Sequence, residues 1–132
     1  MKISIIIPTK DRFEYLKETF NFLSKNQFFF TEVIVVDSSI RQSIKIRKLC
    51  NEAKFKTKLL RSKASIAYQR NIGLKNLNKK TDFVMFLDDD ITFQKDALHK
   101  MKLAILESDK NIAGFGFNLQ LNKRINFLDK LK

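Results

Sequence analysis

The feature that most constrains the fold is an alternation of short β-branched runs with stretches of helical periodicity. Residues 3–7 read Ile-Ser-Ile-Ile-Ile and residues 32–37 read Glu-Val-Ile-Val-Val-Asp, and such runs are typical of strands that are buried on both faces. Between them, large apolar residues recur every three or four positions from Phe13 to Leu23, which predicts a helix with one buried face. The start of the chain therefore predicts a strand, a helix and a second strand.

The alternation continues along the rest of the chain. A capping box at residues 11–14 predicts that the first helix begins near Asp11 and ends near Asn26. In residues 54–59 (Lys-Phe-Lys-Thr-Lys-Leu) a lysine stands at every second position, which is typical of a strand with one solvated face at a sheet edge. The other expected elements are a helix capped by Ser38-Ser39 and running to about Ala53, a helix from Ser65 to between Asn76 and Asn78, a strand over 82–87, a helix marked by Leu98, Met101 and Ile105, and a strand over 112–119.

A length of 132 residues leaves room for one domain, since domains most often contain about 100 to 150 residues. Hydrophobic residues make up 44% of the chain and supply a core, whereas three glycines and one proline are too few for a many-stranded sandwich or barrel. Strand and helix units in this order predict a three-layer α/β/α fold with a mainly parallel sheet. We assign residues 1–119 to this domain and residues 120–132 to a basic C-terminal tail.

Cysteine usage and hydropathy bear on the compartment. Cys50 is the only cysteine, which excludes a disulfide framework or a cysteine-based zinc site within one chain. No apolar run approaches the roughly 18 to 20 residues that span a bilayer, and the N-terminal run is too short for a secretory signal. The chain is therefore expected to be cytoplasmic.

Polar motifs directly follow three of the predicted strands. They are Pro-Thr-Lys-Asp at residues 8–11, Asp-Ser-Ser at residues 37–39 and Asp-Asp-Asp at residues 88–90. The carboxyl ends of parallel strands meet at one edge of the sheet, and such folds bind ligands there, near the point where the strand order reverses. We therefore expect the three motifs to converge on one rim.

The three consecutive aspartates are the sharpest of these motifs. Adjacent carboxylates repel one another, and a bound cation would remove that cost. In an extended segment Asp88 and Asp90 point to the same side while Asp89 points away. Carboxylate oxygens suit Mg²⁺ or Mn²⁺ shared with a diphosphate. The alternative is a solvated acidic turn that caps the next helix, but the apolar strand before it and the other rim motifs favour the metal site.

Four segments together give the chain a resemblance to a known enzyme family. Residues 5–12 (Ile-Ile-Ile-Pro-Thr-Lys-Asp-Arg) resemble the opening strand and donor-base loop of the family 2 glycosyltransferases, and residues 35–39 (Val-Val-Asp-Ser-Ser) resemble their second strand with the acid that contacts the base. Residues 67–73 (Ala-Tyr-Gln-Arg-Asn-Ile-Gly) resemble the helix whose Arg-Asn pair lies near the nucleotide, and residues 86–90 (Phe-Leu-Asp-Asp-Asp) resemble the metal-binding DxD segment. The resemblance covers residues 3–119 and implies the Rossmann-like GT-A nucleotide-diphospho-sugar transferase fold.

The resemblance also implies roles for individual residues. It assigns the binding of the nucleotide part of a nucleotide-diphospho-sugar donor to Pro8, Thr9, Asp11, Asp37, Arg70, Asp88 and Asp89. It assigns Mn²⁺ or Mg²⁺ to Asp88 and Asp90. Chemically, Asp37 can accept a hydrogen bond from a base N–H and Arg70 can bind phosphate oxygens in a bidentate contact. The alternatives are a helix N-cap for Asp37 and a surface ion pair for Arg70.

The implied reaction is a metal-assisted inverting displacement that transfers a sugar to a glycan, a lipid-linked acceptor or another acceptor. An Asp or Glu would deprotonate the acceptor hydroxyl, but no residue of this sequence matches that catalytic base. Family members continue into an acceptor-binding half, so we expect donor binding with slow or undetectable transfer unless a second chain, such as a copy of this one in a homo-oligomer, completes the site. The alternatives are a nucleotide- and metal-binding fragment without turnover, and a basic module that binds nucleic acid or an anionic membrane.

Much of the positive charge is confined to one region. Residues 41–63 carry nine basic residues against one acid, Glu52, within a chain whose net charge is +12. We expect this segment on the flank formed by the second helix and third strand, away from the Asp triplet, where it assists peripheral docking at the anionic inner face of the membrane. No nucleic-acid-binding motif accompanies the charge, so no specific nucleic-acid partner is expected.

Overall fold

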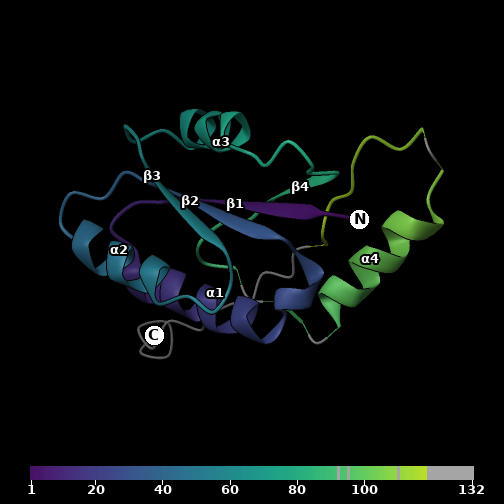
Figure 1. Cartoon of the computed structure of the whole chain (residues 1–132), viewed down its shortest axis with the longest axis horizontal. Coiled ribbons are helices and arrows are strands. Elements are labelled where there is room, and N and C mark those ends of the chain that lie inside the picture. The colour runs from purple at the N-terminus through teal and green to yellow at the C-terminus, as the bar shows by residue number, and fades with distance from the viewer. Residues whose placement is uncertain (92, 95, 110, 119–132) are drawn as a thin grey trace, which may run out of the picture.

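A computed structural model describes residues 1–91, 93–94, 96–109 and 111–118, which form a four-stranded parallel sheet between two layers of helices (Figure 1). The strand order is β3-β2-β1-β4. In chain order the elements are β1 (Ile3–Thr9), α1 (Phe13–Lys25), a 3₁₀ turn η1 (Gln27–Phe29), β2 (Glu32–Asp37), α2 (Ser43–Asn51), β3 (Thr57–Arg61), α3 (Ile66–Lys75), β4 (Phe83–Phe86) and α4 (Ala97–Glu107). The predicted three-layer α/β/α class is confirmed.

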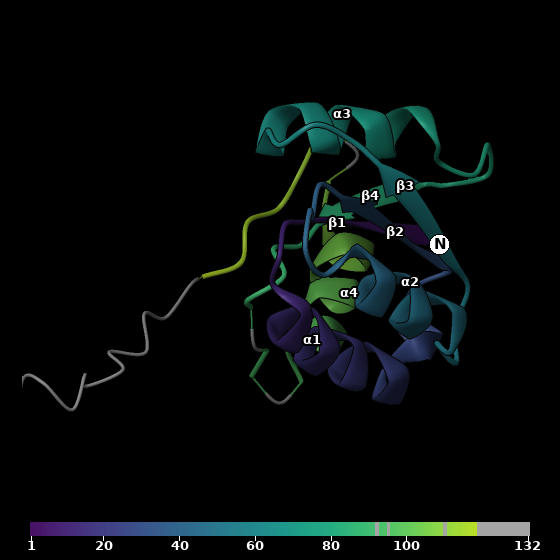
Figure 2. The same ribbon diagram turned by 90° about the vertical axis from the view of Figure 1, so that its left-hand side faces the viewer.

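The arrangement of the helices follows from the strand order. The chain moves outward from β1 to β2 to β3, and then returns through α3 so that β4 pairs with the other side of β1. Helix α3 covers one face of the sheet, whereas α1, α2 and α4 lie on the opposite face (Figures 1 and 2). The strand order therefore reverses between β1 and β4, which is the place where open α/β sheets bind ligands.

Burial on both faces explains why the two inner strands, β1 and β2, are nearly continuous apolar runs. Successive residues of a strand point to opposite faces, so Ile5 and Val33 pack toward α1, α2 and α4, while Ile6 and Ile34 pack toward α3. All four are completely buried. A helical or one-sided pattern would have left one of these faces exposed.

Helix α3 approaches the sheet closely at Gly73. A Cβ atom placed on Gly73 would lie 2.5 Å from Cγ2 of Ile6 and 3.0 Å from its Cδ1. Ile6 lies in the central strand and is completely buried, so its side chain fills the space that an alanine would need. The glycine thus sets the distance between the sheet and the helix that carries Arg70.

A buried carboxylate ties the strands together at their amino ends. Glu32 lies at the start of β2 and is 1% exposed, and its Oε1 accepts hydrogen bonds from Ser4 Oγ (3.1 Å) and the Asn78 N–H (2.8 Å). Its Oε2 lies 3.4 Å from Lys58 Nζ and 3.7 Å from Lys56 Nζ. Burial acts to raise the pKa of Glu32, but the bonds from Asn78, Ser4 and Lys58 outweigh burial and hold the pKa below its ordinary value.

Two boundaries differ from the sequence prediction on the α2 and β3 flank. Strand β3 does lie at the sheet edge, but it begins at Thr57 and extends to Arg61. The apolar residue that suggested an earlier start, Phe55, packs with Phe20 and Phe30 instead, with ring centroids 5.2 Å and 5.4 Å away. The alternation of residues 54–59 therefore reflects core packing before the strand as well as the strand itself.

Helix α2 begins at Ser43, and Ser38 and Ser39 do not cap it. They belong to the connection that leaves β2, and Ser38 N–H donates to the carbonyl of Thr9 at 3.0 Å. The predicted N-caps are therefore wrong because these residues join two strand ends. Their contacts lie across the rim and not along the helix.

The C-terminal predictions have two outcomes. The predicted fifth strand is wrong for residues 112–118, which form no strand in the structure, and its last residue, 119, lies outside the described residues together with the predicted tail at 120–132.

The basic segment at 41–63 does include α2 and β3, but Arg61 near its end lies at the carboxyl rim, so the segment is not wholly remote from that rim. Among the helices that the structure describes, none is long and apolar enough to cross a membrane.

Candidate functional site

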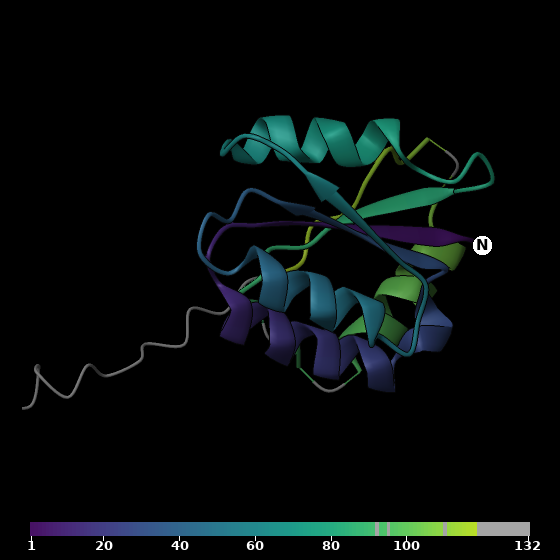
Figure 3. The same cartoon turned by 60° about the vertical axis from the view of Figure 1, so that its left-hand side comes forward.

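The carboxyl ends of the strands bring the predicted motifs to one rim. Thr9, Asp37 and Arg61 are the last residues of β1, β2 and β3, and the acidic turn of residues 88–90 follows β4. The connections that leave these ends lie on the side of the molecule opposite the N-terminus (Figure 3). The expected convergence of the three motifs is therefore confirmed.

Asp89 is the buried centre of the acidic turn. Its Oδ2 accepts a hydrogen bond from Thr9 Oγ1 at 2.7 Å, and its Oδ1 accepts one from Arg12 Nη1 at 3.2 Å. Its backbone carbonyl accepts from Thr19 Oγ1 of α1 at 3.0 Å. Burial raises the pKa of Asp89, against the opposing effect of the Thr9 and Arg12 contacts. These contacts fix the turn to the end of β1 and to α1.

The repulsion within the aspartates is compensated from inside the chain. Arg12 Nη1 also contacts Asp90 Oδ2 at 2.9 Å, and Arg70 Nη2 of α3 contacts Asp88 Oδ1 at 2.9 Å. Asp89 and Asp90 thus share one guanidinium while Asp88 contacts another, whereas strand alternation predicted that Asp88 and Asp90 point to the same side. The reason is that residues 89 and 90 form a turn after β4 has ended, so strand alternation does not apply to them.

The side chains of the turn fit a divalent cation in part. Asp88 and Asp90 each place one carboxylate oxygen on an arginine, and their second oxygens accept no hydrogen bond from the described residues. Such hard oxygen donors suit Mg²⁺ or Mn²⁺, which complete their coordination with water and substrate phosphates. Among the described residues, no group of three or more His, Cys, Asp or Glu side chains is arranged to hold a metal ion. A cation here would therefore need water or substrate phosphate oxygens in addition to the carboxylates of the turn.

Asp37 is completely buried, and its carboxylate is engaged within the rim. Oδ1 accepts from the Ser39 N–H at 2.7 Å, and Oδ2 pairs with Arg61 Nη1. Arg61 Nη2 also donates to the carbonyl of Ser39 at 2.6 Å. Asp37 is not the N-cap of α2, so that alternative is wrong. A contact with a nucleotide base remains a prediction for this residue.

Asp11 organises the connections that follow β1 and β2. Its carboxylate accepts hydrogen bonds from three consecutive backbone N–H groups, those of Ile40 (3.3 Å), Arg41 (2.9 Å) and Gln42 (3.1 Å). The bond from Arg41 is the main reason that the pKa of Asp11 lies below its ordinary value. The predicted capping box is wrong, because α1 begins after Arg12 with no side-chain cap and Asp11 points to the other loop.

Three residues of the rim were absent from the predicted site. They are Arg12, Arg61 and Gln69, and Gln69 is a buried glutamine on α3 whose Nε2 donates to the carbonyls of Val36 (2.7 Å) and Thr9 (3.1 Å). Arg12 follows β1 and Arg61 is the last residue of β3. Their position at strand ends could have predicted from the sequence that both lie at the rim. Gln69 had no such signal, because its partners are backbone carbonyls far away in the sequence.

Pro8 and Arg70 are the remaining residues of the predicted site, and they lie on β1 and α3. Pro8 is buried within β1 and pairs in register with Val36, and Arg70 lies on α3 with its guanidinium carbon 5.5 Å from the ring centroid of Phe86. The Nε of Arg70 is buried and has no hydrogen-bond partner in the part of the chain that the structure describes. Arg70 forms an ion pair, as its alternative proposed, but it retains an unused donor.

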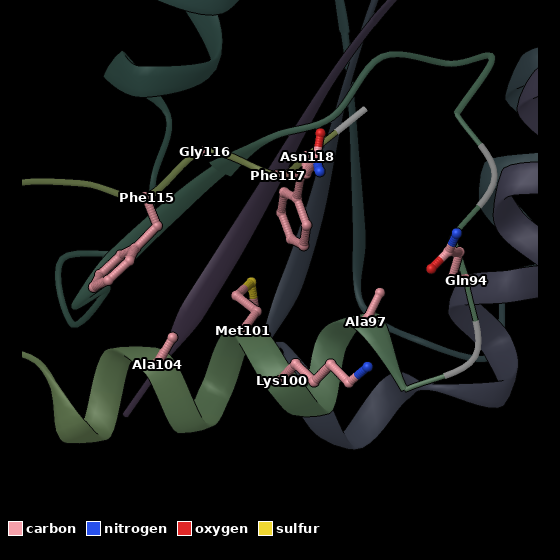
Figure 4. Close-up of a pocket in the computed structure, with 9 residues that line it drawn as sticks. All are labelled: Gln94, Ala97, Lys100, Met101, Ala104, Phe115, Gly116, Phe117 and Asn118. Carbon is pink, nitrogen blue, oxygen red and sulfur yellow. The ribbon is translucent and has the colours of Figure 1, made fainter. Parts of the chain in front are cut away.

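An apolar hollow has none of these rim residues among the described residues that line it. A pocket of about 290 Å³ is formed between α4 and residues 115–118, and Met101, Phe115 and Phe117 line it (Figure 4). Among the described residues that line it there is no carboxylate, and Lys100 is the charged one. The predicted site needs carboxylates and arginines, which the rim has and this apolar lining lacks, so we place the candidate site at the rim.

Comparison with known proteins agrees with this geometry. The sequence profile described as "Glycosyl transferase family 2" matches residues 4–124, which is most of the chain. The chain belongs to glycosyl transferase family 2. A curated relative of this family-2 chain is the poly(ribitol-phosphate) beta-N-acetylglucosaminyltransferase TarS of Staphylococcus aureus, which is 34% identical over 103 residues. That alignment covers 74% of this chain and 18% of TarS, so the chain spans less than a fifth of the relative's length.

Solved structures support the GT-A-like fold of this family-2 chain. The crystal structure of S. aureus TarS 1-349 in complex with UDP-GlcNAc matches with a TM-score of 0.66 and 28% identity, covering 93% of this chain and 38% of that one. The structure of 4-diphosphocytidyl-2C-methyl-D-erythritol synthase from Anaerococcus prevotii matches with a TM-score of 0.65 at 18% identity, covering 80% of this chain and 50% of that one. The second match bears on the fold alone.

Proposed function

We propose that this family 2 chain is the donor-binding part of a glycosyltransferase that moves a sugar from a nucleotide-diphospho-sugar to a glycan, a lipid-linked acceptor or another hydroxyl-bearing acceptor. Mn²⁺ or Mg²⁺ assists by binding at the acidic turn. The proposal concerns the donor side, because the chain spans 18% of the length of TarS. The crystal structure of the relative TarS in complex with UDP-GlcNAc supports a nucleotide sugar as the donor class.

One observation carries the proposal, namely that cationic and anionic groups meet at the reversal of the strand order. Arg70 from α3 and the acidic turn after β4 lie together through the contact of Arg70 with Asp88. A diphosphate needs positive charge from a guanidinium or a cation, and carboxylates are needed to hold that cation. The rim offers both beside Thr9, at the place where α/β sheets bind ligands.

The rim residues have distinct parts in the proposed reaction. Arg70, whose side chain is 35% exposed, binds a phosphate oxygen through its guanidinium and so favours departure of the nucleoside diphosphate. Asp88 and Asp90 present to a cation the carboxylate oxygens that accept no hydrogen bond within the described part of the chain, and the cation when bound would add positive charge to the leaving diphosphate. Asp37 and Asp11 hold the loops against which the nucleoside lies. No described residue is assigned as the base that deprotonates the acceptor.

A titration with nucleoside diphosphates tests the donor assignment. UDP, GDP, CDP and ADP are titrated calorimetrically with and without Mn²⁺, at low and at moderate salt. We expect one base to be preferred and the affinity to rise when Mn²⁺ is present. Binding of every polyanion alike, without Mn²⁺ dependence and with steep loss at moderate salt, would contradict the proposal and favour a general basic binder.

Two charge-removing variants make the same titration specific to the rim. Asp90→Asn should abolish the Mn²⁺-dependent part of nucleotide binding and leave the circular dichroism spectrum unchanged. Glu52→Gln removes one carboxylate from an exposed position at the end of α2 and should leave binding unchanged. An Asp90→Asn variant that keeps the full Mn²⁺ effect would remove Asp90 from the site.

Turnover distinguishes an active transferase from a binding fragment. Positioning of the acceptor and a general base are both needed for transfer, and loss of a base typically costs about 10²-fold to 10⁴-fold in rate. We expect this chain to bind the donor and to transfer sugar slowly or undetectably by itself. Rapid transfer by a monomeric preparation would mean that a base lies within this sequence.

A further inference from the structure

Arg12 has an unusual position at the acidic turn. Its Nη1 contacts Asp90 Oδ2 at 2.9 Å and Asp89 Oδ1 at 3.2 Å. Among the described residues, Arg12 alone pairs with two of the three aspartates, because Arg70 pairs with Asp88. The guanidinium thus lies between the two carboxylates of the turn, where a small cation would otherwise reduce their repulsion.

Arg12 is also free to leave this position. It lies in the connection before α1, its side chain is 51% exposed, and the ring centroid of Tyr15 lies 5.8 Å from its guanidinium carbon. Its backbone carbonyl, and not its side chain, serves the helix by accepting from the Leu16 N–H at 3.1 Å. A change in the direction of the side chain therefore leaves α1 in place. The pair with Asp90 is solvent-exposed, and such pairs contribute little to stability. The buried Asp89 keeps its bond from Thr9 Oγ1 and the bond from Thr19 to its carbonyl when Arg12 leaves, so the turn stays attached to β1 and α1.

We infer that Arg12 is an exchangeable internal counter-ion that couples cation binding to diphosphate binding. This inference rests on the proposed donor-binding function and adds a regulatory residue to it. Without a ligand, Arg12 neutralises Asp89 and Asp90 and thereby opposes a divalent cation at the same turn. When the nucleoside diphosphate arrives, the phosphate oxygens receive the guanidinium, and the released carboxylate oxygen of Asp90 becomes available to the cation.

Charge and geometry give the direction of this coupling. A guanidinium and a divalent cation on the same carboxylates repel each other, so each disfavours the other at the turn. An arginine binds phosphate at least as readily as carboxylate, because its planar fork matches both. Moving Arg12 from carboxylate to phosphate therefore relieves the repulsion and satisfies the ligand in one step. The free protein would bind Mn²⁺ weakly, and UDP and Mn²⁺ would each tighten the binding of the other.

Three titrations on each of four proteins test the inference. Mn²⁺ alone, UDP alone, and UDP at saturating Mn²⁺ are measured calorimetrically for the unmodified chain, for Arg12→Gln, for Arg12→Lys and for the control Arg47→Gln. Arg47 is an exposed arginine on α2, so the control removes the same charge away from the turn. The binding of Mn²⁺ alone needs neither nucleotide nor turnover, which makes it the deciding measurement.

We expect Arg12→Gln to bind Mn²⁺ alone about threefold to tenfold more tightly, since one partly exposed ion pair no longer competes. The factor by which Mn²⁺ improves UDP binding should fall by at least the same amount, while Arg47→Gln should change neither quantity. Arg12→Lys keeps the charge but replaces the fork with a single ammonium, and should tighten Mn²⁺ binding less than Arg12→Gln. Circular dichroism and thermal unfolding check that each variant is folded.

Equal or weaker binding of Mn²⁺ alone by folded Arg12→Gln would overturn the inference, since Arg12 would then position the turn for the cation. If Arg12→Gln does not fold, Arg12→Lys decides by the same criterion. Failure of the proposed function is a different result, namely no nucleotide binding by any of the proteins with or without Mn²⁺. In that case the Mn²⁺ titrations still report whether Arg12 competes for the turn.

Discussion

Substitution of Gly73 by alanine tests how closely α3 must approach the sheet. The added Cβ would lie 2.5 Å from Ile6 Cγ2, about 1 Å inside ordinary contact, and 3.0 Å and 3.1 Å from two further atoms of the same side chain. Overpacking of this kind costs about 1 to 3 kcal/mol, while the better helix propensity of alanine returns about 1 kcal/mol. Because the clash falls on a completely buried side chain of an inner strand, we expect an overpacking cost of about 2 to 3 kcal/mol and therefore a net loss of about 1 to 2 kcal/mol in the free energy of unfolding.

Urea denaturation followed by circular dichroism measures this loss, and thermal unfolding should show a decrease of roughly 4 °C per kcal/mol for a domain of this size. Asn71→Ala is the matched control, because Asn71 is exposed on the same helix and its substitution adds helix propensity without a clash. In an Ile6→Ala background all three contacting atoms are absent, so Gly73→Ala should become neutral or stabilising. A Gly73→Ala protein as stable as the unmodified chain would refute the close-approach argument.

Three further predictions concern buried groups. The pKa of Glu32 lies below its ordinary value of 4.5, so the ionised group stabilises the fold above that pH and loses this effect as the pH falls through the folded value. In urea titrations, Glu32→Gln should therefore show a smaller loss of unfolding free energy between about pH 5 and pH 3 than the unmodified chain. The same loss in both proteins would contradict this. Burial, with a smaller effect from the charge of Asp37, raises the pKa of Cys50 to about 12, so a thiol reagent at neutral pH should modify Cys50 only in denaturant, and rapid modification of the folded protein would count against it. Arg61→Ala removes the partner of a completely buried Asp37 and should cost about 1 to 3 kcal/mol, whereas Arg47→Ala should cost less than about 0.5 kcal/mol; equal effects would mean that the pair is unimportant.

The sequence predicted the parts of the fold that depend on local patterns. β2 has the predicted bounds of Glu32–Asp37, and α3 begins after its predicted cap, Ser65, whose Oγ accepts from the Tyr68 N–H. Both signals are contained within a few residues of the chain. The convergence of the strand ends was also predictable, because it follows from the parallel order of the strands alone.

The parts that the sequence did not predict depend on contacts between distant residues. Asp11 reads as a helix cap, but it binds N–H groups about thirty residues later in the chain. In an extended segment the Asp89 side chain would point away from the side that Asp88 and Asp90 share, but the turn directs it to Thr9, eighty residues earlier. Local rules describe neither contact, since both exist only after the strands have paired.

The Glu32 carboxylate at the amino end of the sheet has a consequence for how the chain folds during synthesis. Its partners include Ser4 from β1, Lys58 from β3 and the backbone of Asn78, and Ser4 Oγ in turn lies 2.8 Å from Thr81 Oγ1. These groups come from segments that leave the ribosome at very different times, so the cluster cannot close until residue 81 has been made. Up to that moment the buried carboxylate is paired only in part, which favours late locking of the strand register. Since Ser4 pairs with Glu32 and Thr9 with Asp37 in the same register, closing this cluster at the amino ends also aligns the ends of β1 and β2 at the rim.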